Sequence, residues 1–214
     1  MVIAIDGPAG AGKSTVARGA ARALGFTYLD SGAMYRCVAL AALRAGADLE
    51  DPARMGELAR RIQIAIADGE VTLDGETVAN AIRAPDVSAA ASRVSVHPEV
   101  RDAMVAQQRA LIESGDYVAE GRDIGTVVSP GAPLKVFLTA SDAARARRRA
   151  AETREAVDDV LAAQAARDAR DREREHGRLR PAPDSVEIDT TGLDADEVVE
   201  RVVGLARERG LVAA

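Results

Sequence analysis

Near its start the chain carries a glycine-rich segment that ends in a lysine and a hydroxyl residue, Gly7-Pro-Ala-Gly-Ala-Gly12-Lys13-Ser14. This segment follows the apolar run Val2–Ile5 and precedes a helical pattern. A strand, a glycine loop and a helix in this order form the P-loop arrangement, in which backbone N–H groups and the helix N-terminus surround a phosphate. The feature therefore requires a strand and a helix on its two sides, and it predicts binding of a nucleoside triphosphate.

We expect the whole loop to contact the triphosphate and its accompanying Mg²⁺. Lys13 would reach the β- and γ-phosphates, and the hydroxyl of Ser14 would be the metal ligand. The expected nucleotide-binding set is Gly7, Pro8, Ala9, Gly10, Ala11, Gly12, Lys13, Ser14 and Thr15. A chance match in a glycine-rich loop is the alternative, which the correct flanks on both sides disfavour.

Composition and charge limit the classes of partner. At 214 residues the chain suits one α/β domain, residues 1–214. Aromatic residues are only 2% and the net charge is −6, so base-stacking platforms are scarce and a polyanion would be repelled. The four apolar residues before Asp6 are too few for a signal peptide, and no later run has the length of a membrane span. We expect a cytoplasmic monomer that binds neither nucleic acid nor membrane.

Short apolar runs alternate with helical or mixed segments, a pattern typical of a parallel sheet covered by helices on both faces. The predicted strands are Val2–Asp6, Thr27–Leu29, Tyr117–Glu120, Leu134–Thr139 and Val186–Asp189. The predicted helices are Lys13–Leu24, Ala33–Arg44, Pro52–Ile66, Glu99–Ile112 and Ala195–Arg209. The predicted fold class is α/β, with a P-loop NTPase core built on a five-stranded parallel sheet.

Two segments depart from this alternation. Between about 60 and 95, two β-prone runs flank Asp74-Gly75, a dipeptide suited to a type I′ turn, and predict a small antiparallel insertion. We expect the insertion to bind substrate, although a surface hairpin without function fits the same pattern. From about 142 to 176 the chain is poor in large apolar residues, which predicts a weakly anchored, mobile helical lid.

Arginines gather in three places where a second ligand would lie. Asp30–Arg36 and Gly121–Gly125 each follow a predicted strand, at the sheet edge where ligands bind in parallel α/β folds. A third group, which fits a solvated helix with ion pairs equally well, comprises Arg167, Arg170, Asp171 and Arg174. Because ATP and a monophosphate bring roughly six negative charges and Mg²⁺ with Lys13 cancels about half, several arginines are needed.

These segments together resemble bacterial cytidylate kinases over nearly the whole chain. The matching stretches, in the family's order, are I-D-G-P-A-G-A-G-K-S, L-D-S-G-A-M-Y-R, A-A-S-R-V-S-V-H-P-E-V-R, G-R-D-I-G-T-V-V, R-D-A-R-D-R-E-R and P-A-P-D-S-V-E-I-D-T-T. The resemblance implies a nucleoside monophosphate kinase of pyrimidine metabolism. Such an enzyme transfers the γ-phosphoryl group of ATP to CMP or dCMP and yields ADP with CDP or dCDP.

The resemblance also implies roles for single residues. It assigns the base pocket to Ser92, Arg101 and Asp123, the monophosphate to Ser31, Tyr35, Arg36 and Arg122, the ribose to Arg167 and Asp171, and the region between the substrates to Arg174. The family's lid arginines fall on Arg145, Arg148 and Arg149, and the expected catalytic groups are Lys13, Arg122, Arg148 and Arg174. A carboxylate such as Asp123 accepts a hydrogen bond from the cytosine amino group but opposes the uracil carbonyl, so CMP should be preferred to UMP.

Two other functions fit the P-loop. One is a related small-molecule kinase that acts on UMP or AMP. The other is a nucleotide-dependent switch that hydrolyses its ligand slowly, which would need a water-positioning residue and switch loops that the sequence does not identify. A purely structural role would leave the P-loop unexplained.

Overall fold

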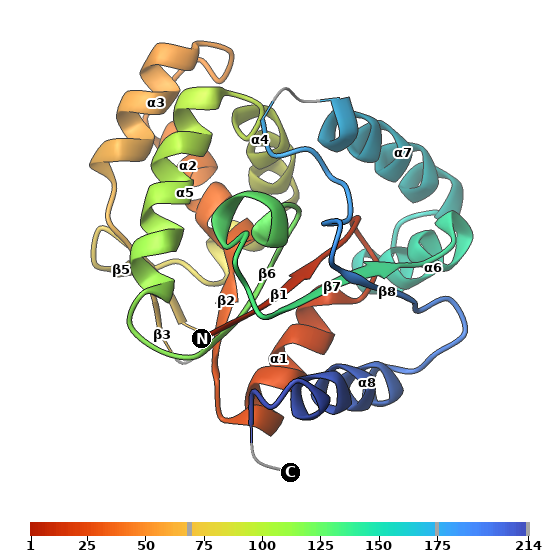
Figure 1. The fold of residues 1–214 in the computed structure, drawn as a ribbon. Helices are drawn as coiled ribbons and strands as arrows, with labels where there is room; N and C mark the ends of the chain where they lie inside the picture. The colour runs from red at the N-terminus through yellow and green to blue at the C-terminus, as the bar shows by residue number, and fades with distance from the viewer. Residues whose placement is uncertain (68–69, 174–175, 213–214) are drawn as a thin grey trace. The chain divides into compact units, whose positions relative to one another are not determined.

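The computed structural model describes residues 1–67, 70–173 and 176–212. The chain divides into two compact units. The first comprises Met1–Tyr28 and Gly115–Ala214, and the second comprises Leu29–Ser114. Figure 1 shows the elements of both units as a ribbon.

A parallel sheet flanked by helices carries the P-loop. Within the described residues it has five strands in the order β2-β6-β1-β7-β8. They are β1 (Val2–Asp6), β2 (Thr27–Asp30), β6 (Tyr117–Gly121), β7 (Leu134–Thr139) and β8 (Val186–Asp189). The central strand β1 is buried throughout because it pairs on both sides, with Ile5 opposite Glu120 and Val136. The sequence predicted all of these strands, and the α/β fold class is confirmed.

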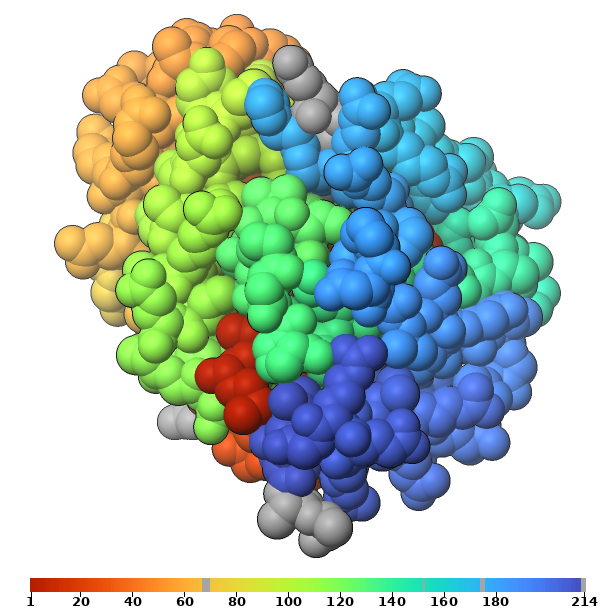
Figure 2. Space-filling model, in the orientation of Figure 1, coloured from red at the N-terminus to blue at the C-terminus, as the bar shows by residue number. Residues whose placement is uncertain are grey.

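The helices of the first unit are α1 (Lys13–Leu24), α6 (Asp142–Thr153), α7 (Val157–Glu173) and α8 (Ala195–Glu208), with one π-helical turn, η2 (Ile124–Val128). Helices α1 and α8 lie side by side in Figure 1, so closely that a Cβ on Gly19 would be 2.6 Å from Val199. Their inner faces cover a core that includes Ile3, Ile5 and Val202. The outer face of α8 is the dark blue surface in Figure 2.

The second unit combines helices with a small antiparallel sheet. Its helices are α2 (Ser31–Arg44), α3 (Pro52–Arg61), α4 (Pro85–Val94), α5 (Pro98–Ile112) and the 3₁₀ turn η1 (Ala81–Arg83). In the described residues the sheet has three strands, β3 (Ile64–Ala67), β4 (Glu70–Leu73) and β5 (Glu76–Thr77). Asp74 and Gly75 have φ of 51° and 85°, and positive φ at both positions is what a type I′ turn requires. The predicted antiparallel hairpin is confirmed.

One expectation about the second unit was wrong, and one helix was missed. The helix predicted to run to Ile66 ends at Arg61, because residues from Ile64 onward pair with β4 as strand β3. Alternating isoleucines favour a strand at this point over the helix that the preceding charged residues favour. Helix α4 was not predicted, since its buried face consists mostly of alanine and valine.

Helices α6 and α7 occupy residues 142–153 and 157–173, within the segment predicted to be a lid. Their buried apolar contacts are few and small, in a cluster of Ala146, Ala150 and Val160. In the portions of the chain that the structure describes, no helix is both long and apolar enough to cross a bilayer.

Candidate active site

The P-loop lies between the end of β1 and the start of α1, and two glycines shape it. A Cβ on Gly7 would lie 2.2 Å from the carbonyl oxygen of Leu138 on β7, so only glycine allows this approach. Gly12 is the N-cap of α1 with φ of 85°, in the left-handed region that favours glycine. The loop therefore places the first N–H groups of α1 where they can donate hydrogen bonds to an anion.

Lys13 is buried and folds back over this loop. Its Nζ donates a hydrogen bond to the carbonyl oxygen of Pro8 at 2.8 Å. The pKa of Lys13 is lowered to about 7, first by burial and then by the charge of Arg122, with Arg167 adding to the effect. Several cations thus share a buried region, and a bound polyanion would relieve their repulsion.

Arg122 and Asp171 form a buried ion pair within the first unit. Arg122 Nε donates to Asp171 Oδ2 at 2.8 Å. Burial opposes the charge of Arg122, but the attraction and the hydrogen bond of Asp171 outweigh it, and the pKa of Arg122 is raised. The pair fixes the turn after β6 against α7, one helical turn beyond Arg167. The structure thus brings together four residues of the predicted site, Lys13, Arg122, Arg167 and Asp171.

Two buried carboxylates beside these cations escaped the sequence analysis. Asp6 ends β1 and accepts hydrogen bonds from the backbone N–H groups of Ile124 at 2.9 Å and Gly125 at 2.7 Å. Glu120 accepts a hydrogen bond from the hydroxyl of Tyr28, and its charge raises the pKa of Lys13. The available signal was an acidic residue at the carboxyl end of each of two apolar strands.

Of the predicted lid arginines, Arg145 contacts the P-loop directly. Its side chain is only 3% exposed, and Nη1 donates to the carbonyl oxygen of Ala9 at 2.9 Å. Nη2 lies 2.7 Å from Asp168 Oδ2 on α7 and 2.6 Å from Asp142 Oδ1. Buried polar contacts therefore anchor both helices of the lid segment on the P-loop.

Arg148, the expected catalytic arginine of the lid, is bound one turn further along α6. It donates to the hydroxyl and the carbonyl oxygen of Thr190, at 3.0 and 2.5 Å. The Thr190 hydroxyl lies 3.3 Å from the carbonyl oxygen of Ala11 in the P-loop. Thr190 thus connects Arg148 to the P-loop. Arg174 lies outside the described residues.

In the second unit, Asp30 connects the start of α2 to a predicted phosphate ligand. Its Oδ1 caps the helix by accepting from Ala33 N, and its Oδ2 accepts from Arg36 Nη2 at 2.8 Å. Among the described residues, the buried Nε of Arg36 has no hydrogen-bond partner, and it is a donor that suits an anion. The residue pair Asp30 and Arg36 therefore keeps one guanidinium edge engaged and leaves another for a ligand.

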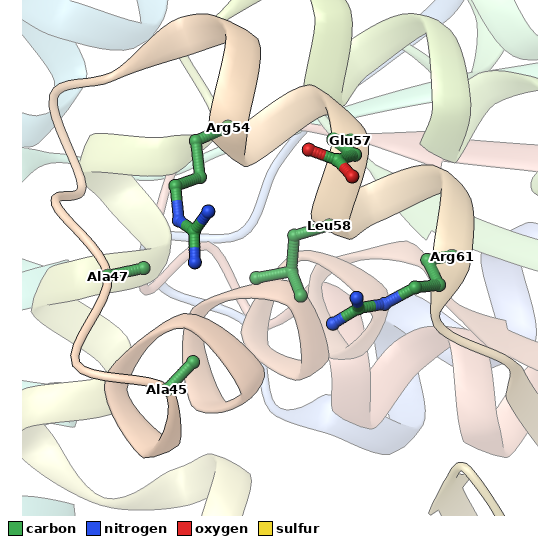
Figure 3. Close-up of a pocket in the computed structure, with 6 residues that line it drawn as sticks. All are labelled: Ala45, Ala47, Arg54, Glu57, Leu58 and Arg61. Carbon is green, nitrogen blue, oxygen red and sulfur yellow. The ribbon is translucent and has the colours of Figure 1, made fainter.

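The other predicted residues of the second unit are largely buried. Arg101 lies over the ring of Tyr35 at 5.6 Å from its centroid, a cation–π contact. Ser31, Ser92 and Arg101 are buried polar residues. A cavity of about 50 Å³ in this unit, shown in Figure 3, is lined by Ala45, Ala47, Arg54, Glu57, Leu58 and Arg61. It is too small for a nucleotide, and none of the predicted site residues lines it.

The residues around the P-loop suit Mg²⁺ better than a metal held by the protein alone. Ser14 is exposed in the first turn of α1. Within the described ranges, no three His, Cys, Asp or Glu side chains are grouped as they would be around a metal ion. Mg²⁺ commonly uses one or two protein oxygens, nucleotide phosphates and water, and a hydroxyl beside a phosphate loop fits that pattern.

The fold and this loop define the class of P-loop nucleotide-binding proteins. A gluconokinase from Sinorhizobium meliloti 1021 has a similar fold, with a TM-score of 0.54 and 17% identity over 98% of this chain and 94% of its own. The chain belongs to the cytidylate kinase family, whose sequence profile matches residues 3–208.

Relatives in this family are similar over almost their full length. A cytidylate kinase of Solibacter usitatus is 50% identical over 98% of this chain and 93% of its own length. A second, from Caldanaerobacter subterraneus, is 48% identical over 96% of this chain and 94% of its own. The family resemblance inferred from the motifs is confirmed.

Proposed function

We propose that the chain transfers the γ-phosphoryl group of ATP to CMP or dCMP, yielding ADP with CDP or dCDP. One observation carries the proposal: a P-loop whose Lys13 shares a buried region with Arg122 and Arg167, in a member of the cytidylate kinase family. The attacking group is a phosphate oxygen that is largely ionised near neutral pH, so no general base is needed. Catalysis then consists of placing two phosphates in line and neutralising their charge.

The proposed nucleotide site is the P-loop, from Gly7 to Thr15. Its N–H groups and Lys13 hold the β- and γ-phosphates, and Lys13 exchanges the Pro8 carbonyl for them. Mg²⁺, when bound, neutralises charge on the phosphates. Ser14 is the proposed ligand, and the buried carboxylate of Glu120 is a second candidate.

The proposed monophosphate and nucleoside contacts are those that the family resemblance assigns. Arg36, Arg122, Ser31 and Tyr35 are the proposed ligands of the phosphate oxygens. Asp123 is the proposed acceptor for the base amino group, and Ser92 and Arg101 are also assigned to the base. Arg167 and Asp171 contact the ribose, while Arg148 and Arg174 stabilise the transferring group. The Nε of Arg36 in one unit, and the clustering of Arg122 and Arg167 around Lys13 in the other, support anion binding.

We further propose that 1–214 acts as a single kinase domain, in which residues 60–95 bind substrate and residues 142–176 close over it. The enzyme would work as a cytoplasmic monomer without nucleic-acid or membrane partners. The small buried apolar area of α6 and α7 supports a lid that moves.

An ATP-coupled assay with CMP, dCMP, UMP and AMP tests the function, each run with Mg²⁺ and with EDTA. We expect rapid ADP formation with CMP or dCMP, only in the presence of Mg²⁺. A preference for UMP or AMP would show the alternative kinase, and hydrolysis of ATP that CMP leaves unchanged would favour the nucleotide-dependent switch.

A further inference from the structure

A remote carboxylate caps the helical turn that begins beside the proposed base-reading residue. The first N–H groups of any helix have no partner within the helix and need a cap. At η2, Asp123 occupies the N-cap position, yet among the described residues its own side chain makes no capping bond. Asp6, 118 residues earlier in the chain, accepts from Ile124 N, and its other oxygen accepts from Gly125 N.

This cap lies at the end of a strand that is paired on both sides. Asp6 is the last residue of β1 and pairs with Gly121 on β6 and Phe137 on β7. The backbone of Asp123 is held from its other side too, because its carbonyl oxygen accepts from Val127 N at 2.8 Å. The turn that carries Arg122 and Asp123 is therefore bonded through both its N–H and its C=O groups.

Burying the charged carboxylate of this cap costs free energy. Asp6 is only 5% exposed, and a buried carboxylate costs free energy unless hydrogen bonds compensate it. Burial, and to a lesser degree the neighbouring charge of Asp123, raise the pKa of Asp6, while the two N–H groups and Lys13 lower it. A neutral capping residue would avoid this cost, so the position is one where local stability gives way to another requirement.

We propose that Asp6 is a positioning residue for cytosine recognition, which holds the turn 122–125 so that Asp123 meets the base. The inference deepens the proposed function and rests on it, because it takes Asp123 as the reader of the base. Asp6 touches neither substrate in this account. It acts only through the two backbone bonds it accepts.

The main alternative is that Asp6 serves the P-loop alone, since Gly7 follows it directly. The two roles differ in which substrate they affect. If Asp6 served the P-loop alone, its loss would weaken the binding of ATP and would lower activity with every monophosphate by the same factor. A role through the turn would lower activity with CMP more than with UMP, because only CMP offers the amino group that Asp123 accepts.

The test is Asp6→Asn in the full chain, assayed with CMP and with UMP at saturating Mg-ATP. Asparagine keeps the shape but presents one amide that cannot accept an N–H, so one capping bond is lost. We expect kcat/KM for CMP to fall about 10- to 100-fold, mostly through KM, and the CMP-to-UMP ratio to fall at least about 10-fold. The KM for ATP should change less than about threefold. Equal losses with both monophosphates would overturn the proposal.

A double-mutant cycle sharpens the result. If Asp6 acts through Asp123, then Asp6→Asn in an Asp123→Ala background should change kcat/KM for CMP by less than about threefold. Full additivity of the two losses would contradict the proposal. Asp194→Asn is the matched control, because Asp194 also caps a helix start by accepting from Glu197 N, but at α8. We expect it to leave the CMP-to-UMP ratio unchanged.

Circular dichroism establishes whether Asp6→Asn folds. If it does not, Gly125→Ala tests the contact with Asp6 intact, because the new Cβ would lie 3.4 Å from Asp6 Oδ2 and 3.2 Å from Lys135 Cδ, so either the turn or the buried Lys135 side chain must move. A lower CMP-to-UMP ratio supports the proposal, and an unchanged ratio overturns it. A wild-type chain that makes no CDP would instead overturn the proposed function itself.

Discussion

Arg145 joins the lid segment to the P-loop by a single side chain that bonds to both. Its guanidinium donates to the Ala9 carbonyl at 2.9 Å and pairs with Asp168 at 2.7 Å, with both side chains almost fully buried. A buried ion pair is costly to break from one side, because the remaining charge loses its only compensation. The stability of the first unit should therefore depend on this arginine.

We expect Arg145→Ala to lower the free energy of unfolding by about 3–5 kcal/mol, since Asp168 would be left charged and buried. Urea denaturation measures the change. The matched control is Arg93→Ala, whose pair with Glu50 is 48% and 61% exposed, and it should cost about 0–1 kcal/mol. Similar losses in the two variants would contradict the role of burial.

Lys13→Ala should abolish phosphoryl transfer while the fold persists. Lys13 is the proposed contact to the β- and γ-phosphates, and its loss should reduce kcat by about 10³-fold or more. The coupled assay gives the rate and circular dichroism the fold. Arg44→Ala removes an exposed cation that pairs with Glu76 and should keep normal turnover. Near-normal activity of Lys13→Ala would refute the assignment.

Asp123→Ala should reduce kcat/KM for CMP much more than for UMP. The lost carboxylate accepts a hydrogen bond only from the cytosine amino group, and such a contact is typically worth about 10- to 100-fold. Steady-state kinetics with both nucleotides provide the comparison. If both substrates lose equally, Asp123 has no part in reading the base.

The contribution of Asp6 to the stability of the protein should fall as pH rises from about 4 to about 6. Burial raises the pKa of Asp6 from 3.8 to about 6, so in this range the folded chain binds a proton that the unfolded chain has released. The contribution is fully present below the unfolded pKa and is lost as pH rises through the folded pKa of about 6, a total change of about 3 kcal/mol. We would measure the free energy of unfolding at several pH values in this range. Its dependence on pH should be weaker in Asp6→Asn than in the wild type. An equal dependence in the two proteins would count against the burial of the charge.

Cys37 should resist alkylation in the native protein. Its side chain is fully buried and burial raises its pKa to about 12, so only about one molecule in 10⁴ carries a thiolate at pH 8. Reaction with a thiol reagent should be slow in buffer and complete in denaturant. Rapid modification without denaturant would show that the second unit opens readily.

The sheet of the first unit was predictable because its strands are short apolar runs separated by clear helical patterns. The second unit was harder to predict. Residues 62–66 contain alternating isoleucines, which favour a strand, but they follow charged residues that favour a helix. Pairing with β4 decides in favour of the strand. Helix α4 offers only small residues to its neighbours, which leaves a weak periodic signal.

The site was predictable where a motif spans several residues, and not where one residue acts over a long distance. The P-loop and the pair of Arg122 with Asp171 lie in recognisable segments. Asp6 is a single acidic residue after an apolar run, and the sequence around it does not predict that it accepts hydrogen bonds from Ile124 and Gly125. Likewise, the sequence places several arginines on α6 but does not say that Arg145 is the one turned inward.

The bond from Lys13 to Pro8 changes what it means for a nucleotide to enter the P-loop. The ammonium already has an acceptor within the loop, so an arriving triphosphate must displace a carbonyl before it gains this cation. Binding of the triphosphate therefore replaces the hydrogen bond from Lys13 to Pro8 and does not simply add a new one. This replacement lowers the net gain from the lysine and keeps the loop in shape between turnovers.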